Sequence, residues 1–173
     1  MTNSASELRI RPAAPLDAAN IVRLLKQCWE ETRAAQFARV NDQKAIQYVV
    51  ETMAVSFVAV AEISGRIVGV IALTPYKEPW SDDVAMAEEW YYVVPSFRSR
   101  GAAALLLQEA ELFCDLQQVP MLFGINASQP KELDEFFARR QGYTYMGGNY
   151  MRTPKDGQQE NDDDPQDGDS ALA

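Results

Sequence analysis

The chain has 173 residues, 47% of them hydrophobic, and a formal net charge of −9, a size that suits one domain with a single core. Acids outnumber bases 25 to 16, which argues against a nucleic-acid partner, because affinity for phosphate backbones comes from clustered Lys and Arg. The absence of histidine removes the usual Ser-His and Cys-His nucleophile pairs and most zinc sites, so we expect no metal.

The first third of the chain predicts one strand and two helices. Residues 1–7 are short and polar, and we expect them to be disordered. A strand is predicted over Leu8 to Arg11, where apolar and basic residues alternate. Pro15 then opens a helix, because the missing N–H of proline is harmless in the first turn. A second helix is predicted to start at a capping Asp42. Its expected buried stripe consists of Ile46, Val49, Val50 and Met53.

The middle and end of the chain predict further strands. Residues 56–63 and 66–75 flank Ser64-Gly65 as a hairpin, and Gly69 weakens the second strand or marks a bulge. The remaining expected elements are a strand over 84–94, a helix after it, a strand over 119–126, a helix over 129–141 and a hairpin over 143–152. This order predicts an α/β fold (α+β mixed sheet) with helices on its faces.

Both ends and the cysteines bear on the cellular setting. Residues 155–173 hold seven acids, one lysine and no aromatic residue, so we expect a disordered acidic tail after a domain of residues 8–154. We find no secretory signal pattern and no apolar run of the ~20 residues that span a membrane. We therefore expect a cytoplasmic protein without a membrane partner. Cys28 and Cys114 are expected to be buried free thiols.

The stretch from Val93 to Phe113 carries the main functional signal. An apolar strand stops at Pro95, passes through two arginines and Gly101, and restarts as a helix rich in alanine and leucine. The free N–H groups of a helix start attract anions, and a glycine lets a phosphate lie against the main chain. The Gly-Lys-Ser/Thr of a nucleotide P-loop and the three spaced glycines of a dinucleotide site are both missing. A helix that merely follows a strand remains the alternative.

The residues Arg98-Ser-Arg-Gly101-Ala-Ala103 resemble the Gln/Arg-x-x-Gly-x-Gly/Ala signature of the GNAT N-acetyltransferase superfamily. The spacing of Val93, Pro95 and Arg98 is typical of its fourth strand, and the order of elements agrees over roughly Leu8 to Thr153. The resemblance implies six to seven mostly antiparallel strands, helices on both faces, and a splay between strands four and five. The stretch from Trp80 to Gln108 also resembles GNAT proteins encoded by bacteriophages, which would place the protein in the host cytoplasm.

The resemblance implies acetyl-CoA as co-substrate, bound in the splay. Main chain at Val93 and Val94 would pair with its pantetheine, and Asn126 would contact the same arm. Side chains of the two loop arginines would favour the phosphates by charge. The main-chain amides implied to hold the pyrophosphate are those of Arg98, Ser99, Arg100, Gly101, Ala102 and Ala103.

Acetyl transfer to an amine needs a base, an N–H donor for the developing oxyanion, and a proton for the departing thiolate. Glu88 and Glu89 on the fourth strand are the candidate bases. Successive strand residues face opposite sides, so only one of them can point into a cleft. Alternation places the Glu89 side chain on the same face of the strand as those of Tyr91 and Val93, and we slightly prefer Glu89 as the base. The N–H of Val94 is the expected oxyanion donor.

The proton donor departs from the family pattern. In the superfamily it is commonly a tyrosine on the last helix, but that position holds Ala138 or, if the helix is one residue longer, Phe137. Tyr143, Tyr145 or Tyr150 on the final hairpin could substitute. Otherwise the thiolate leaves unassisted, which its pKa near ~8.5 permits, or catalysis is lost.

Acids and aromatic residues gather around the fourth strand. The groups in question are Trp80, Asp82, Asp83, Glu88, Glu89 and Trp90. Because such groups attract cations, we favour an acceptor that is a polyamine, an aminoglycoside, a lysine or an N-terminal amine. A plain polar turn over residues 81–83 is the alternative.

Two functions therefore compete, an acetyl-CoA-dependent N-acetyltransferase and a degenerate GNAT-fold module that acts as a structural or host-interaction protein of a phage. The resemblance also suggests a homodimer, since GNAT proteins often pair.

Overall fold

The computed structural model describes residues 7–32, 38–124, 139, 143 and 144. Its elements in chain order are β1 (Leu8–Pro12), the 3-10 helix η1 (Pro15–Asp17), α1 (Ala18–Glu31), α2 (Asp42–Val55), β2 (Phe57–Ile63), β3 (Arg66–Tyr76), β4 (Ala85–Val93), α3 (Pro95–Arg98), α4 (Ala102–Gln117) and β5 (Met121–Leu122). The helix expected over 129–141 and the hairpin over 143–152 lie outside the described residues, apart from Arg139, Tyr143 and Thr144. The tail and residues 1–6 also lie outside them.

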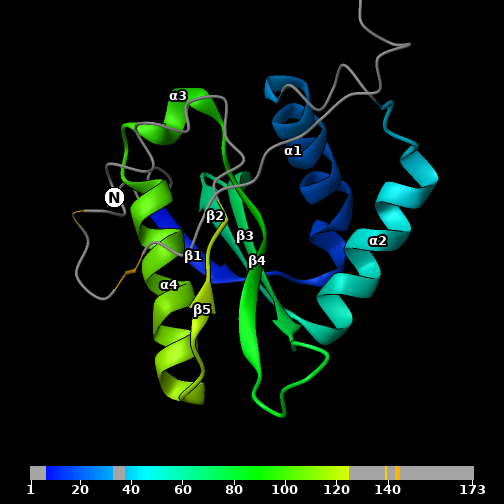
Figure 1. Ribbon diagram of the computed structural model, residues 1–173. Helices are drawn as coiled ribbons and strands as arrows, with labels where there is room; N and C mark the ends of the chain where they lie inside the picture. The colour runs from blue at the N-terminus through cyan, green and yellow to red at the C-terminus, as the bar shows by residue number, and fades with distance from the viewer. Residues whose placement is uncertain (1–6, 33–37, 125–138, 140–142, 145–173) are drawn as a thin grey trace, which may run out of the picture.

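The strands form one sheet between two helical layers (Figure 1). The sheet order is β1-β2-β3-β4-β5, and neighbouring strands are antiparallel except for the parallel pair β4 and β5. Helices α1 and α2 cover one face and α4 covers the other. This arrangement confirms the mixed sheet with helices on both faces and a splay between the fourth and fifth strands.

The start of α2 differs from the prediction. The cap is Asn41, whose side chain accepts a hydrogen bond from the Lys44 N–H at 3.1 Å, and Asp42 is already helical. The predicted buried stripe was wrong in part, because Ile46 and Val50 are about half exposed. Helix α2 packs mainly on α1 instead of the sheet, and a helix that meets one other helix covers only a narrow stripe.

The β2–β3 hairpin turns where the sequence predicts. Ser64 and Gly65 both have positive φ, at 50° and 75°, as the tight turn of a hairpin requires. Gly69 lies beside a register shift opposite Ala61 and Glu62, so the expected bulge is present. A Cβ at Gly69 would lie 3.0 Å from Leu106 Cδ1, which shows that the glycine lets α4 approach β3 closely.

Each face of the sheet has its own core. On the α4 side, Ile71, Leu73 and Leu106 are fully buried, together with the free thiol of Cys114. On the other side, the core is formed by α1, α2 and the opposite face of the same strands. Cys28 there is half-buried and also free. The two cysteines therefore lie on opposite faces of the sheet as free thiols, and the prediction that they are buried is confirmed for Cys114 but not for the half-buried Cys28.

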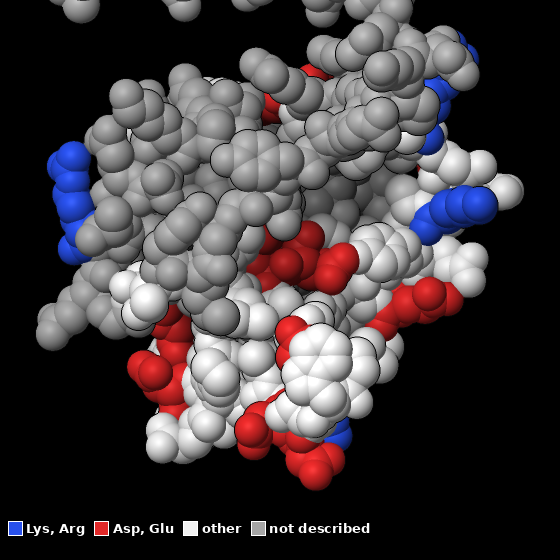
Figure 2. Space-filling view, viewed as in Figure 1, with Lys and Arg blue, Asp and Glu red and all other residues white. Residues whose placement is uncertain are grey.

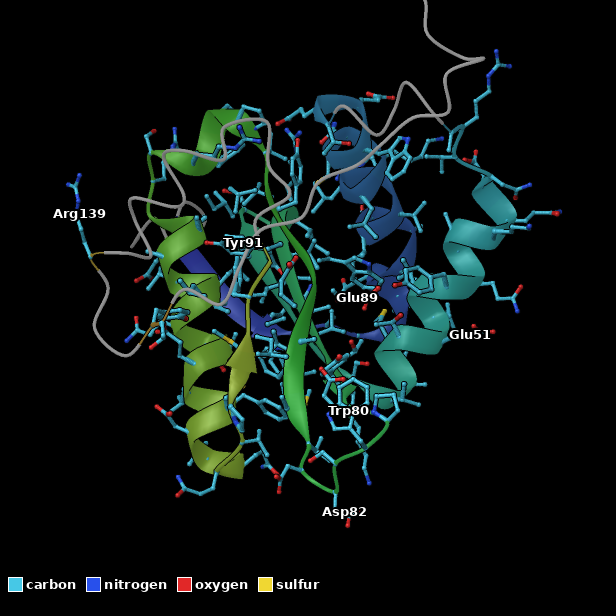
Figure 3. The ribbon with its side chains drawn as sticks, in the orientation of Figure 1. Glu51, Trp80, Asp82, Glu89, Tyr91 and Arg139 are labelled. Atoms are coloured by element: carbon cyan, nitrogen blue, oxygen red, sulfur yellow. The ribbon has the colours of Figure 1, made fainter. Side chains whose placement is uncertain are left out.

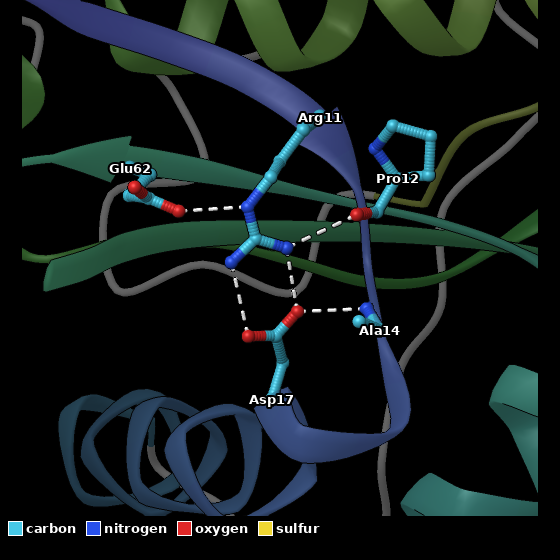
Figure 4. Close-up of polar contacts among 5 residues, drawn as sticks. All are labelled: Arg11, Pro12, Ala14, Asp17 and Glu62. Carbon is cyan, nitrogen blue, oxygen red and sulfur yellow. Dashed lines mark hydrogen bonds and ion pairs between the residues drawn. The ribbon is translucent and has the colours of Figure 1, made fainter. Parts of the chain in front are cut away.

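An ion cluster ties the N-terminal strand to the rest of the sheet (Figure 4). Arg11 donates two hydrogen bonds to Asp17, at 2.6 and 3.0 Å, and one to Glu62 at 2.7 Å. Asp17 also accepts from the Ala14 N–H at 2.7 Å. The hydrogen bonds from Arg11 outweigh burial and lower the pKa of Asp17. The cluster joins β1, η1 and β2, three segments that the sequence does not visibly link.

Candidate active site

The fork between β4 and β5 is where the site begins. The two strands pair only through Met86 with Met121 and Ala87 with Leu122. Strand β4 continues to Val93 while β5 ends at Leu122. Beyond residue 87, β5 therefore no longer pairs with the edge of β4 within the described residues, and this edge is a candidate to bind an extended ligand arm through its main chain.

The polar groups on this edge can be assigned from the pairing with β3. The Val94 N–H donates to the Val68 carbonyl of β3 at 2.9 Å. It is therefore not available to an oxyanion, and the prediction for Val94 was wrong in this respect. Main-chain groups of successive strand residues point to opposite edges, so the N–H groups of Tyr91 and Val93 face the fork. The carbonyl of Val93 already accepts from Arg98 Nε at 2.9 Å.

The loop after β4 leads into α4 through a left-handed glycine. Gly101 has φ +80° and is the N-cap of α4, and a Cβ built on it would meet nothing within 4 Å. The glycine is therefore needed for its backbone conformation, and the space in front of it is open. Having no side chain, Gly101 cannot cap the helix, so the first-turn N–H groups of α4 have no capping partner from it.

Fewer loop amides are free to bind a phosphate than the sequence implied. The Arg100 N–H donates to the Phe97 carbonyl at 3.1 Å, and the Ser99 N–H is directed to the same oxygen. Neither amide is free for a phosphate here. The first intrahelical bond of α4 runs from the Leu105 N–H to the Gly101 carbonyl at 3.0 Å. The amides of residues 101–104, at the positive end of the helix dipole, therefore remain as the candidate anion site.

The two loop arginines lie in different surroundings. Arg98, expected to attract phosphates, instead forms an ion pair with Glu31 of α1, with 2.5 Å between Nη2 and Oε2. Arg100 is exposed, stacks its guanidinium 5.2 Å from the centre of the Phe97 ring, and makes no ion pair with the described residues. Of the two, only Arg100 offers an unpaired charge at the loop.

The two candidate bases lie at a bulge in β4, which breaks the alternation used to choose between them. The register shifts so that Leu73 faces Glu88 and Ala72 faces Trp90, leaving Glu89 as the extra residue. Residues directly opposite each other share a face, and Leu73 belongs to the α4-side core. Glu88 therefore shares the face of Tyr91, and the parity argument for Glu89 fails at the bulge.

Glu88 has the environment of a base that works near neutral pH. Burial raises its pKa to about 7, although a hydrogen bond from the Gly124 main chain, just beyond β5, acts in the opposite direction. A carboxylate with a pKa near the working pH is suited to remove a proton from an ammonium group. Its bond to Gly124 places it at the β4–β5 fork.

Glu89 lies on the other side of β4. Figure 3 shows it directed toward α1, whereas Tyr91 is directed toward α4. Thr74 Oγ1 donates to Glu89 Oε2 at 3.1 Å, and burial raises the pKa of this carboxyl. Figure 2 shows acidic side chains gathered in a hollow at the centre of the face on which β4 and β5 meet. The site thus presents negative charge to an incoming acceptor.

The other acids and aromatics of the expected acceptor region are not brought together. Trp90 is buried, and Trp80 is 83% exposed on the β3–β4 loop. Asp82 lies at the tip of this loop, well away from Glu89 (Figure 3), and forms an ion pair with Lys77 at 3.2 Å. Of the predicted acceptor-binding groups that the structure describes, Glu88 and Glu89 are therefore the acids that lie on β4.

The family model described as the acetyltransferase (GNAT) family matches residues 18–143. The chain belongs to this family. No curated protein matches it, so the remaining comparisons are with solved structures.

Three such structures share the fold of this GNAT acetyltransferase. A GCN5-related N-acetyltransferase from Ralstonia eutropha JMP134 is 20% identical, with a TM-score of 0.67 over 87% of this chain and 100% of that one. The ribosomal-protein-alanine N-acetyltransferase from Brucella melitensis biovar Abortus 2308 is 14% identical, with a TM-score of 0.62 over 86% and 100%. The aminoglycoside N-acetyltransferase AAC(6')-Iy, in complex with coenzyme A, is 16% identical, with a TM-score of 0.64 over 90% and 99%.

Of the remaining site residues predicted for this acetyltransferase, the structure describes Tyr143. The Tyr143 hydroxyl donates to Glu111 Oε1 of α4 at 2.8 Å, so it would have to leave that carboxylate to protonate a thiolate. Asn126, Ala138, Tyr145 and Tyr150 lie outside the described residues. No cluster of three or more metal-binding side chains occurs in the described part of the chain, and none of its helices is long and apolar enough to cross a membrane.

Two residues of the site were not singled out from the sequence. Tyr91 bonds through its hydroxyl to the Ala103 carbonyl at 2.8 Å, which fixes the first turn of α4 against β4. Thr74 orients Glu89 from the neighbouring strand. Tyr91 and Thr74 could have been identified only from the strand register, because each contacts a residue that is distant in the sequence.

Proposed function

We propose that this GNAT acetyltransferase transfers the acetyl group of acetyl-CoA directly to a cationic amine acceptor. The observation that carries the proposal is the uncapped start of α4, open in front of Gly101 and set beside the β4–β5 fork. Such a start binds a diphosphate through main-chain N–H groups. The solved structure of AAC(6')-Iy in complex with coenzyme A, which has the same fold, supports the same ligand here.

The residues at the fork have separate tasks in this scheme. Glu88 accepts the proton of the acceptor ammonium and so frees the lone pair that attacks the acetyl carbonyl. A main-chain N–H on the fork edge of β4 donates to the developing oxyanion. The C–S bond of the thioester then breaks, coenzyme A leaves as its thiolate, and the new amide nitrogen gives its remaining extra proton to solvent. With its hydroxyl bonded to Glu111, Tyr143 does not protonate the thiolate unless it leaves that carboxylate.

Glu89 contributes to acceptor binding in the same scheme. Its carboxylate faces α1, on the opposite side of β4 from the base. This second carboxylate, on the neighbouring residue, adds negative charge across the strand and so favours acceptors that carry more than one positive charge. Polyamines and aminoglycosides fit this description, as does a lysine or N-terminal amine in a basic segment.

Thermal unfolding with and without millimolar acetyl-CoA tests the proposal. A ligand that binds only the folded state at a hundredfold excess over its Kd stabilises it by about 2.7 kcal/mol. We expect this increase in the parent and its loss in Gly101→Asp, which places a negative charge in front of the α4 amides. Gly65→Asp is the matched control, because Gly65 also has positive φ and open space around its Cβ position but lies in the β2–β3 turn.

One observation favours the alternative of a degenerate, phage-type interaction module, namely that no described tyrosine hydroxyl is free at the fork to act as the acid. The two functions differ in whether acetyl-CoA is consumed when an amine is present. An acetyltransferase releases the free thiol of coenzyme A from acetyl-CoA faster when spermidine or an aminoglycoside is added. A stabilised protein without amine-dependent thiol release would instead support the module.

A further inference from the structure

A cluster of three side chains links α1 to the loop before α4. Arg98 Nη2 lies 2.5 Å from Glu31 Oε2, and the Tyr92 hydroxyl donates to Glu31 Oε1 at 2.6 Å. The Arg98 guanidinium also lies 5.5 Å from the centre of the Tyr92 ring. Glu31 is the last residue of α1 and is separated from Arg98 by 67 positions. We call Glu31, Tyr92 and Arg98 the brace.

The brace holds the loop before α4 to the end of β4 as well as to α1. Arg98 Nε donates to the Val93 carbonyl at 2.9 Å, which holds the end of α3 against the end of β4. With Nη2 bonded to Glu31, the planar guanidinium is fixed in two directions, and its fork geometry leaves little rotational freedom. Three residues later, Gly101 begins the turn whose amides form the anion site. The position of these amides therefore depends on where Arg98 is held.

The charge balance of the brace shows which role Arg98 has. Burial opposes ionisation of Glu31, but the hydrogen bonds from Tyr92 and Arg98 outweigh it and lower the pKa of this carboxyl. Glu31 thus carries a full negative charge that neutralises Arg98. The side chains of the pair are 31% and 45% exposed, so the pair is only partly screened by solvent. The exposed Arg100 remains the loop cation with an unpaired charge.

We propose that Glu31 is a positioning residue of the acetyl-CoA site: it holds Arg98, and through Arg98 the loop that begins α4, in the conformation that binds the diphosphate. This inference rests on the proposed acetyl-CoA site. It assigns Arg98 to holding the loop and Arg100 to attracting the phosphates. It also couples the end of α1, on one face of the sheet, to the ligand-binding loop that leads to the other face.

The proposal predicts the direction in which the Kd for acetyl-CoA changes when Glu31 is replaced. If Glu31 positions the loop, Glu31→Gln loosens Arg98 and raises the Kd for acetyl-CoA by about tenfold, the scale of one charge-assisted hydrogen bond. If Arg98 were a phosphate ligand held back by Glu31, the same substitution would free a cation and lower the Kd. Glu30→Gln, an exposed neighbour on the same helix, is the matched control and should leave the Kd unchanged.

Isothermal titration with acetyl-CoA, well below the Tm of each variant, measures the effect in folded protein only. The Arg98→Gln variant should weaken binding as Glu31→Gln does, and the double variant should be no worse than either single one, because both remove the same interaction. In turnover, the KM for acetyl-CoA should rise with little change in kcat. An unchanged or lower Kd in Glu31→Gln would overturn the proposal that Glu31 positions the loop. Effects of the two substitutions on the Kd that add fully in the double variant would overturn it as well.

A second readout separates this inference from the proposed function. Hydrogen exchange of the amides of residues 96–101, measured without ligand, should be about tenfold faster in Glu31→Gln than in the parent or in Glu30→Gln. If the parent itself fails to bind acetyl-CoA, the proposed function is wrong. The exchange rates then decide alone whether Glu31 holds the loop, and equal rates would show that it does not.

Discussion

Replacing Glu88 by glutamine should raise stability and lower activity, with a pH dependence that identifies the cause. An ordinary glutamate ionises at 4.5, whereas burial raises the pKa of Glu88 to about 7. Between these values the unfolded chain has lost the proton and the folded chain keeps it, so stability falls as pH rises through this window. The stabilising contribution of the neutral carboxyl is complete below pH 4.5 and is lost as pH rises through 7.

The magnitude follows from the difference between the two pKa values. One pKa unit corresponds to about 1.36 kcal/mol, so burial of Glu88 costs about 3 kcal/mol of folding free energy at pH 8, where the carboxyl is ionised, and about 1 kcal/mol at pH 5.5, where the folded chain keeps the proton that the unfolded chain loses. Glu88→Gln cannot ionise and keeps an oxygen for the Gly124 N–H. Relative to the parent, it should therefore gain about 2 kcal/mol between these two pH values.

Urea unfolding at pH 5.5 and pH 8 measures this gain, and thiol release from acetyl-CoA with an amine measures activity. We expect kcat to fall about 100-fold, which is typical for the loss of a general base. The control is Glu51→Gln, an exposed carboxylate on α2 that accepts from Gln47. It should change the free energy of unfolding by less than about 0.5 kcal/mol at either pH. If the stability difference between Glu88→Gln and the parent is the same at both pH values, Glu88 is not a buried base.

Two further predictions concern the fold that supports the site. Gly69→Ala should lower the free energy of unfolding by about 1–3 kcal/mol, because its Cβ would lie 3.0 Å from Leu106 Cδ1 and 3.2 Å from the Tyr92 carbonyl oxygen. Urea unfolding tests this, and a loss below about 0.5 kcal/mol would contradict the close packing of α4 on β3. Asp17→Asn should cost about 1–3 kcal/mol at pH 7, since Arg11 would lose one of its two charged partners and keep only Glu62. The parent should lose this contribution as pH falls through the lowered pKa of Asp17, so the two proteins should converge in acid, and a constant difference would refute the assignment.

Local patterns in the sequence were enough to predict the fold. The alternation in β1, the turn at Ser64-Gly65 and the strand–loop–helix at Gly101 depend on neighbouring residues, and the structure confirms them. Gly101 was predicted for its missing Cβ, and its φ of +80° adds a second reason for glycine there. Such features are encoded within a few positions.

The errors concern features that depend on distant partners. The bulge at Glu89 appears only when β4 is aligned with β3, and it removes the strict alternation on which the choice between the two glutamates was based. The ion pair of Arg98 needs Glu31, far away in the sequence. The Val94 N–H was assigned to the ligand because its partner Val68 could not be seen without the strand register. Pairing across the sheet thus decides which polar groups remain available to a ligand.

The ion cluster at Arg11 has a consequence for the order in which the chain is made. Arg11 can meet Asp17 soon after synthesis, but Glu62 follows 51 residues later. At typical rates of translation this is a wait of roughly 3–10 s, and β1 has no strand to pair with until β2 is complete. The nearby Asp17 can hold the Arg11 side chain during that interval. Strand β1 is thus made first but stays unpaired until β2 is complete, and it depends on a local ion pair until the distant one can form.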